Sequence, residues 1–599
     1  MANRTPEELY QNRIAKLKNE LSVFNRKKSR LAWLRFFALI GCIAGSWLLW
    51  PWGISIVFMY FPASLFLFLF IVKIDLNNKN SISNHEILVD INLQEIDVLH
   101  HKFTHLPGGN EFQPADHSYA NDLDIFGKSS LYQYINRTTS QQGNQLMASW
   151  LLNSASATLI HQRQAAVKEL EQNTEWRQQL QAFGLSKQIT TATQNKIEQW
   201  LQQENKFIDK LIWKAVRILL PFICISIIVL YAFDIVPSQW FNLSMLLFLA
   251  IAFGITKWVM PLYLQLNKIA SEIGTLKDSV EWIEKAVFKS ELLKDLQSSF
   301  VNQRQQASIS IHQLRKIFSR LDYRLNPVVF IPLNTILLWD LQQVLSLEKW
   351  KQTNRHNISN WFHSLAQFEV LSSIANLAAN QPYWCYPEPA QHDYVFLAKD
   401  LGHPLIEKEK LVTSSFSTNG NQQISLVTGS NMAGKSTFLR SVGTNIVLSH
   451  TGAPVCASSL TISPMRVISS MRISDNLEES TSTFYAELKK LKQIIEAVSK
   501  HEHAFLLLDE ILRGTNSKDR HTGSEALIKQ LLRDKAAGIV ATHDLELTNL
   551  AAVFPHNIHN YHFDAAIKNE ELYFDYKLKE GICSSMNASL LMKKIGIEL

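Results

Sequence analysis

Four long apolar runs interrupt an otherwise mixed pattern in the first half of the chain. They cover residues 35–50, 53–72, 217–233 and 240–260. A helix that crosses a bilayer needs roughly 20 mostly apolar residues. The second and fourth runs are long enough alone, whereas the first and third need their flanks. A short turn joins the two runs of each pair, at 51–52 and at 234–239. The pattern predicts two transmembrane helical hairpins; buried core helices of a soluble protein are the alternative.

Basic side chains gather on one side of these runs. They precede the first and third runs and follow the second and fourth: Arg26, Lys27, Lys28, Arg30, Arg35, Lys73, Lys206, Lys210, Lys214, Arg217, Lys257 and Lys268. The two turns contain no lysine or arginine. Membrane interfaces favour aromatic anchors, and six tryptophans lie near the run ends: Trp33, Trp47, Trp50, Trp52, Trp240 and Trp258. Because cytoplasmic flanks carry the excess positive charge, we expect a multi-pass membrane protein with both termini in the cytoplasm.

The remaining pattern is mostly helical. Residues 140–210 and 261–380 are rich in Gln, Leu, Lys and Glu with helical spacing, which predicts long lever helices with solvated outer faces. A further apolar stretch, 325–340, contains Pro327 and Pro332. These prolines interrupt a helix, so we expect this stretch to pack in the core; a fifth membrane segment is the alternative.

Composition agrees with a chain that is partly in lipid. Of the 599 residues, 46 % are hydrophobic and only 19 % are charged, and this length suggests several domains. The net charge of +6 is modest and also arises from basic membrane flanks, so it does not by itself indicate nucleic acid. The five cysteines are scattered and form no CxxC pair, which argues against disulfides and zinc.

Candidate chemistry appears in the last third, in the sequence GSNMAGKST that ends at Thr437. It follows a strand-like run and opens a helix, which is the context of a phosphate-binding loop. Gly429 and Gly434 let the backbone turn its N–H groups toward phosphate oxygens. Lys435 would reach the terminal phosphates, and Ser436 would ligate Mg²⁺. The loop therefore predicts ATP and Mg²⁺ as cofactors.

Two further strand-like runs end in polar residues. The apolar run 504–508 leads to Asp509 and Glu510, and a second apolar run leads to His543. Parallel strands present their carboxyl ends at one edge of a sheet. We therefore expect Asp509 to hold Mg²⁺, Glu510 to polarise the attacking water and His543 to contact the terminal phosphate.

These segments resemble the ATPase domain of MutS-type proteins, which belong to the larger ABC ATPase class. The resemblance is carried by TGSNMAGKSTFLR, STFYAEL, LLLDEILRGTNSKDR and GIVATHDLEL, and it extends roughly over 120–185 and 265–599. Asn431 and Met432 fit the family's variant of the phosphate loop. The resemblance implies that Ser482 and its neighbours contact nucleotide held by a partner subunit. Residues 513–516 would cross the same interface, so a homodimer through the ATPase heads is expected.

Other parts of the chain depart from this family. Repair-type members begin with a mismatch-reading domain that carries a Phe-x-Glu wedge, whereas residues 1–120 here contain a basic segment and an apolar hairpin. The second hairpin occupies the place of the family's DNA clamp. Ser480 stands where the family often has glycine.

These observations predict an α/β P-loop domain of the ABC type joined to an all-α lever and core domain with four transmembrane helices. The expected segments are a basic N-terminal part (1–30), a first hairpin (31–75), a linker (76–120), a helical core and lever domain (121–390) interrupted by the second hairpin (about 215–262), and an ATPase domain with a helical tail (391–599).

The functional hypothesis is a membrane-anchored, MutS-like ATPase dimer. ATP hydrolysis would move the lever helices and, through them, the membrane segments or a bound partner. A membrane-tethered DNA-binding protein of the repair or recombination type is the alternative. An ATP-driven transporter is disfavoured, because the runs contain few polar residues and the transporter signature is missing. A nucleotide-switched scaffold is disfavoured by Glu510.

Overall fold

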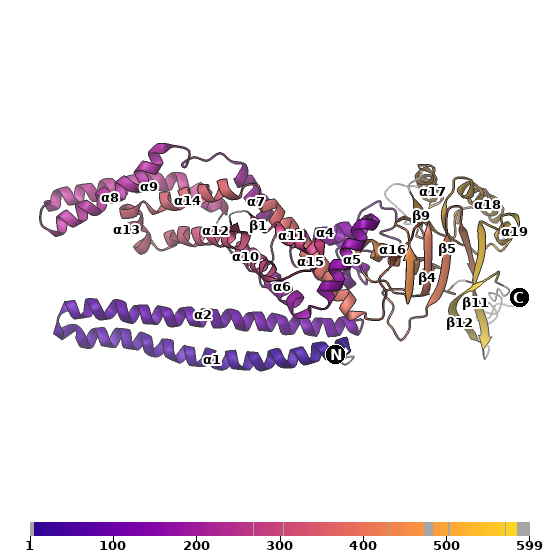
Figure 1. The fold of residues 1–599 in the computed structure, drawn as a ribbon, viewed down its shortest axis with the longest axis horizontal. Helices are drawn as coiled ribbons and strands as arrows, with labels where there is room; N and C mark the ends of the chain where they lie inside the picture. The colour runs from indigo at the N-terminus through magenta and orange to yellow at the C-terminus, as the bar shows by residue number, and fades with distance from the viewer. Residues whose placement is uncertain are drawn as a thin grey trace.

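The computed structural model describes residues 5–266, 269–302, 305–430, 432–472, 483–500, 503–568 and 571–583. The molecule is elongated, with an α/β region at one end and helices over the rest of its length (Figure 1). Two helical hairpins extend from the middle of the molecule away from the α/β region, and their tips lie toward the same end. In coarse terms this mostly helical chain with an α/β region is the predicted fold class.

The first hairpin consists of α1 (Pro6–Leu49) and α2 (Ile54–Leu99), joined through η1 (Trp50–Trp52) and Gly53. Thr5 and Glu8 form a reciprocal capping box at the start of α1. Gly53 has a φ of 110°, which suits the turn. Both helices are longer than the apolar runs. Residues 6–30 of the basic segment are part of α1, and α2 continues through 76–99 of the predicted linker.

The helical core follows a short turn-rich segment that contains η2 (Asn110–Phe112). Its elements are α3 (Leu131–Ile135), α4 (Gln141–Leu152), α5 (Ala157–Glu171), α6 (Thr174–Ser186), α7 (Thr191–Gln202) and α15 (Ile358–Asn380). Four of these helices start at a serine or threonine whose side chain accepts a backbone N–H bond, as helix N-termini require: Ser130, Ser140, Ser156 and Thr190. Helix α15 is buried along most of its length and packs against α4 and α5.

The second hairpin consists of α8 (Leu211–Ala232) and α9 (Ser238–Leu266). The lever region after it comprises α10 (Ala270–Lys285), α11 (Glu291–Ser298), β1 (Val301–Asn302), β2 (Gln305–Gln306), α12 (Ala307–Leu321), η4 (Asp322–Leu325), α13 (Pro327–Leu337) and α14 (Trp339–Asn354). These helices are shorter than expected. Helices α10 and α11 are separated by a non-helical segment, in which Phe288 packs edge-on against Trp176 at 5.5 Å between ring centroids.

Among the described residues, four helices are long and apolar enough to cross a membrane: α1, α2, α8 and α9. Their apolar stretches are largely unburied by protein; Phe58 and Phe66 of α2 and Phe222 of α8 are each at least 70 % exposed. A soluble protein rarely leaves such a surface uncovered. This exposure disfavours the alternative in which the runs are buried core helices.

The α/β region contains two sheets and the helices that flank them. Its elements are β3 (Glu388–Pro389), β4 (Val395–Leu401), β5 (Ser414–Asn419), β6 (Ile424–Gly429), α16 (Lys435–Thr451), β7 (Ser459–Ile462), β8 (Arg466–Ser470), α17 (Thr483–Ser499), β9 (Ala504–Asp509), α18 (Ser517–Arg533), β10 (Ala537–Ala541), η5 (Glu546–Asn549), α19 (Leu550–Val553), β11 (Ile558–Lys568) and β12 (Glu571–Glu580). The larger sheet has the order β12-β11-β6-β10-β9-β8, and only β12 runs antiparallel to its neighbour. The smaller sheet has the order β3-β7-β4-β5.

Candidate functional site

Three neighbouring strands deliver the predicted site residues to one edge of the larger sheet. Strands β6, β10 and β9 are parallel and adjacent, so their carboxyl ends coincide. The glycine-rich loop 429–434 follows β6, the pair Asp509–Glu510 ends β9, and His543 follows β10. Residues more than 100 positions apart thereby meet, as the strand pattern predicts.

Lys435 begins α16 and is buried below the loop. Its Nζ donates to the carbonyl oxygens of Gly429 at 2.8 Å and Ser430 at 3.2 Å. Burial lowers the pKa of Lys435, because the charged ammonium loses water. The lysine is therefore held in place by the same loop whose N–H groups would bind phosphate.

Ser436 and Asp509 form a second contact. The Ser436 hydroxyl donates to Asp509 Oδ2 at 2.6 Å. Asp509 Oδ1 is buried and has no hydrogen-bond partner among the described residues. A hydroxyl beside a carboxylate with an unused oxygen is a donor set that suits Mg²⁺, which prefers oxygen ligands. The two residues assigned to Mg²⁺ thus fit that ion.

Glu510 and His543 form the third contact. His543 Nε2 lies 2.7 Å from Glu510 Oε1, and Arg513 Nε lies 3.1 Å from Glu510 Oε2. The hydrogen bond from His543 lowers the pKa of Glu510 to about 2, with Arg513 adding to the effect. Glu510 has a φ of 49° and its N–H donates to Ala541 of β10. The carboxylate is therefore ionised and held at the edge of the sheet.

The structure describes the two predicted glycines and Met432, but not the other two predicted nucleotide contacts. Gly429 and Gly434 have φ values of 147° and 110°, which other residues adopt only with strain. A side chain at Gly429 would also lie 2.8 Å from the Phe563 carbonyl oxygen. Met432 is 83 % exposed at the top of the loop. Asn431 and Ser482 lie outside the described residues.

A pocket of about 230 Å³ adjoins the loop. Its lining includes Gly434 of the loop and Thr437 of α16, together with His403, Phe563 and Tyr576. Burial and the nearby Arg440 lower the pKa of His403 to about 4, so the ring is neutral. Sequence reasoning did not assign these lining residues, because they come from strands and loops distant from the glycine-rich motif.

The loop after Glu510 packs against the start of α17. Glu487 of α17 accepts hydrogen bonds from the backbone N–H groups of Leu512 and Arg513. A Cβ at Gly514 would lie 2.7 Å from Phe484 Cβ, so only glycine allows this approach. The structure thus joins the two segments that the MutS resemblance places at the dimer interface.

Two aspartates of the turn-rich segment tie the helical core to the α/β region. Asp122 is buried and accepts from Lys490 Nζ at 2.9 Å, Ser469 Oγ at 2.7 Å and the Arg472 N–H at 3.0 Å. Asp124 accepts from Arg472 and from Arg440 of α16. The helix that starts at Lys435 is therefore anchored directly to the core. Nothing in the motifs predicts this contact.

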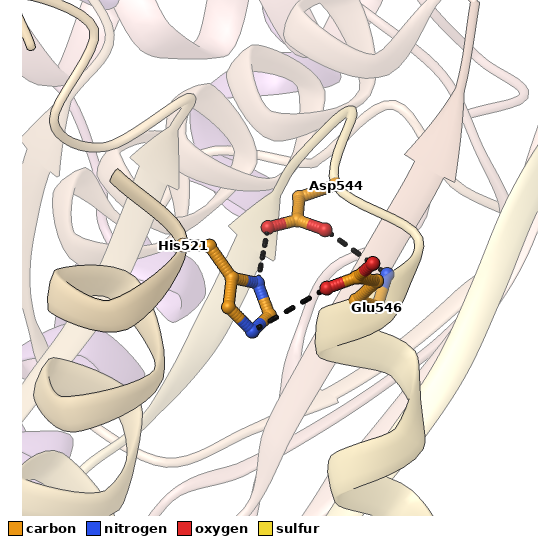
Figure 2. A group of neighbouring side chains, drawn as sticks. All are labelled: His521, Asp544 and Glu546. Atoms are coloured by element: carbon orange, nitrogen blue, oxygen red, sulfur yellow. Dashed lines mark hydrogen bonds and ion pairs between the residues drawn. The ribbon is translucent and has the colours of Figure 1, made fainter. Parts of the chain in front are cut away.

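A histidine and two carboxylates also approach one another near the site (Figure 2). His521 Nδ1 lies 2.6 Å from Asp544 Oδ2, and His521 Nε2 lies 3.7 Å from Glu546 Oε2. Among the described residues this is the group with spacing suited to a metal. However, the two carboxylates face different ring nitrogens (Figure 2), and one imidazole cannot offer both to one ion. The group is better explained as ion pairing that ties α18 to the segment after His543.

Fold and site together define a class: an α/β domain with a glycine-rich loop between a parallel strand and the N-terminus of a helix, an arrangement that binds phosphate groups. A family model narrows this class. Residues 425–594 match MutS domain V, the ATPase-bearing domain of MutS-type mismatch repair proteins. Every predicted site residue lies within that match, which supports the resemblance to the MutS family.

Proposed function

We propose that this chain is a membrane-anchored, MutS-like ATPase that works as a homodimer and transmits nucleotide-driven motion to its membrane hairpins. The observation that carries the proposal is the meeting of Lys435, the Ser436–Asp509 pair and the Glu510–His543 pair at one sheet edge. Each part of this arrangement has a role in phosphoryl transfer from ATP to water.

The residues divide the work of hydrolysis between them. Lys435 and the N–H groups of the loop hold the terminal phosphates, and the pocket beside Thr437 takes the nucleoside end. Ser436 and Asp509 would hold Mg²⁺, which supplies charge neutralisation when bound. Glu510 orients the attacking water; as that oxygen bonds to the γ-phosphorus, the bond to the β-phosphate oxygen breaks and ADP leaves. With a pKa of about 2, Glu510 is a weak base, so its main contribution is orientation, and the proton is released with the phosphate.

The dimer part of the proposal rests on the packing of the loop after Glu510 against α17. In the MutS resemblance both segments face the nucleotide of the partner subunit. Because the loop after Glu510 and the start of α17 are in contact within one chain, each ATPase domain would have one continuous surface. This surface would respond both to its own nucleotide and to that of the partner subunit. ATP would therefore close the two heads onto one another.

The membrane part rests on the arrangement of the hairpins. Both extend away from the α/β region toward the same end (Figure 1), as insertion into one bilayer requires. Their apolar surfaces are exposed over stretches long enough to span it. The basic flanks favour a cytoplasmic position for the ATPase domain. Helix α9 leads directly into the lever helices, so lever motion reaches the second hairpin.

The test is ATP turnover by purified protein in lipid nanodiscs, with Glu510→Gln as the blank and with duplex, mismatched and branched DNA as additions. Turnover that needs Glu510 supports the ATPase, and a lack of turnover refutes it. A rate that DNA changes would favour the alternative of a membrane-tethered DNA-binding protein. Retention in the pellet after a carbonate wash tests membrane insertion separately; release into the supernatant refutes it.

A further inference from the structure

Helix α13 leaves an apolar surface uncovered beside the second hairpin. The sequence predicts core packing for this stretch, and the structure corrects that prediction. The exposed apolar side chains of α13 are Val328 (82 % exposed), Val329 (45 %) and Ile331 (41 %), and Leu325 (74 %) at the end of η4 adjoins them. These four side chains are here called the α13 edge. The two prolines do not break the helix, because Pro327 occupies its first position and Pro332 is accommodated within it. They therefore give no reason for the stretch to pack in the core.

Helix α13 is too short to cross a bilayer. Helices α13 and α14 together have the composition of a span, but they meet at a bend of 77°. Helix α14 packs within the lever, where Leu341, Val344 and Leu347 are fully buried. Only the 11 residues of α13 remain, about 16 Å of helix, whereas the hydrocarbon core is about 30 Å thick.

Polar contacts fix the depth of α13 along α9. Asn334 Nδ2 donates to Thr256 Oγ1 at 3.0 Å, and Thr256 donates to the buried Asp340 at 2.8 Å. At the other end, Tyr263 donates to Asp322 at 2.9 Å. At about 1.5 Å per residue from Ser238, Thr256 lies about 27 Å and Tyr263 about 37 Å along α9. If α9 crosses the bilayer from its tip, α13 lies where the hydrocarbon ends and the headgroups begin.

The side chains around α13 suit that depth. Tyr323 stacks on Trp339 at 5.8 Å between ring centroids, and aromatic pairs of this kind favour the membrane interface. Arg324 is paired with the buried Asp340 at 2.7 Å. Over residues 311–339, Arg315, Lys316 and Arg320 remain, against one other acidic residue, Asp322. Lys316 and, on α9, Lys257 are exposed. This excess of cations complements anionic phospholipid headgroups.

We infer that α13 is a membrane-surface helix, with the α13 edge inserted among the headgroups and upper acyl chains of the leaflet that faces the ATPase domain. The inference rests on the proposed membrane anchorage and extends it. The bilayer then touches the lever itself, because α13 continues into α14. Lever motion would press on or withdraw from the leaflet surface in addition to moving the spans.

The experiment measures lipid depth by fluorescence quenching in the full-length protein. The five native cysteines are replaced by alanine, and single cysteines at Val328, Leu246 and Val287 carry a bimane label in nanodiscs with anionic lipid. Leu246, 63 % exposed on α9, reports the bilayer interior, and Val287, 92 % exposed in the lever, reports water. Phospholipids carry a nitroxide either near the headgroup or near the chain end. Ile331→Cys provides a second position on the α13 edge.

The expected result is that the label at Val328 loses most of its fluorescence to the shallow nitroxide and little to the deep one. The label at Leu246 should show the reverse, and the label at Val287 should respond only to aqueous iodide. A Val328 label that behaves like Val287 overturns the inference while leaving the spans intact. A Val328 label quenched mainly by the deep nitroxide also overturns it, in favour of a broken span. An unquenched Leu246 label refutes the anchorage itself.

Discussion

A buried ion pair joins the first hairpin to the helical core, and its removal gives a quantitative prediction. Glu95 of α2 pairs with Arg137 at 2.5 Å, with side chains only 2 % and 5 % exposed. Asn380 of α15 also donates to Glu95, at 2.8 Å, and Tyr10 of α1 donates to Asn380, at 2.6 Å. The Glu95 carboxylate thus connects the first hairpin, α1 and α2, to the helical core at Arg137 and at Asn380 of α15.

The variant Glu95→Gln leaves Arg137 buried without its counter-charge. Breaking a buried pair in this way costs about 3–5 kcal/mol. Because 1.4 kcal/mol is a tenfold change in an equilibrium constant, separation of α2 from the helical core becomes at least about 100-fold more frequent. Hydrogen exchange measures this opening: backbone amides of 88–99 should lose about 100-fold in protection.

The matched control is Glu175→Gln. Glu175 also links the core to the first hairpin, through Arg13, but its side chain is 70 % exposed. An exposed pair contributes about 0–1 kcal/mol, so the control should change protection by less than about fivefold. Equal effects of the two variants would refute the reasoning that the buried pair holds the hairpin to the core.

Three further predictions follow from the site. Glu510→Gln should lower ATP turnover by about 10²-fold, the order expected when a reactant is no longer positioned. Nucleotide binding, measured by fluorescent analogue titration, should persist; unchanged turnover would exclude Glu510 from the reaction. The hydrogen bond from His543 holds the pKa of Glu510 at about 2, so the carboxylate stays ionised well below pH 4.5, its ordinary pKa. In His543→Ala the pKa of Glu510 rises toward 4.5, so the acid limb of the kcat/KM profile should move to higher pH. A limb that stays in place would contradict the assigned hydrogen bond. Asp122→Asn weakens a buried acceptor of four donors and should lower the stability of the α/β region by about 1–3 kcal/mol in thermal melts. The exposed Asp116→Asn, near Gln493, should change it by less than about 0.5 kcal/mol, and similar melts for both would count against the anchor.

Local patterns in the sequence predicted the helical hairpins and the strand–loop–helix unit well. An apolar run must reach about 20 residues to span a bilayer as a helix, so its length alone is informative. The glycines of the phosphate-binding motif indicate a loop with positive φ values. Because parallel strands must end at a common edge, the proximity of Lys435, Asp509, Glu510 and His543 also followed from the sequence alone.

Contacts between distant segments were not predictable in this way. Asp122 lies in a turn-rich segment whose pattern gives no sign that it binds Lys490 and Ser469, more than 300 positions away. The prediction of core packing fails for most of residues 325–331, because apolar composition does not distinguish a buried from an exposed apolar surface. Only the packing of Asp340 and Asn334 against α9 shows which side of α13 remains exposed.

The central claim is that nucleotide state at the sheet edge changes the position of the membrane hairpins. The most direct measurement is the distance between spin labels at Leu246 of the two subunits in nanodiscs, without nucleotide and with ATP trapped by Glu510→Gln. We expect a different distance distribution in the two states, and no such difference when Lys435→Ala removes nucleotide binding. Identical distributions would contradict this claim if Glu510→Gln binds ATP and the labelled protein with Glu510 intact turns it over.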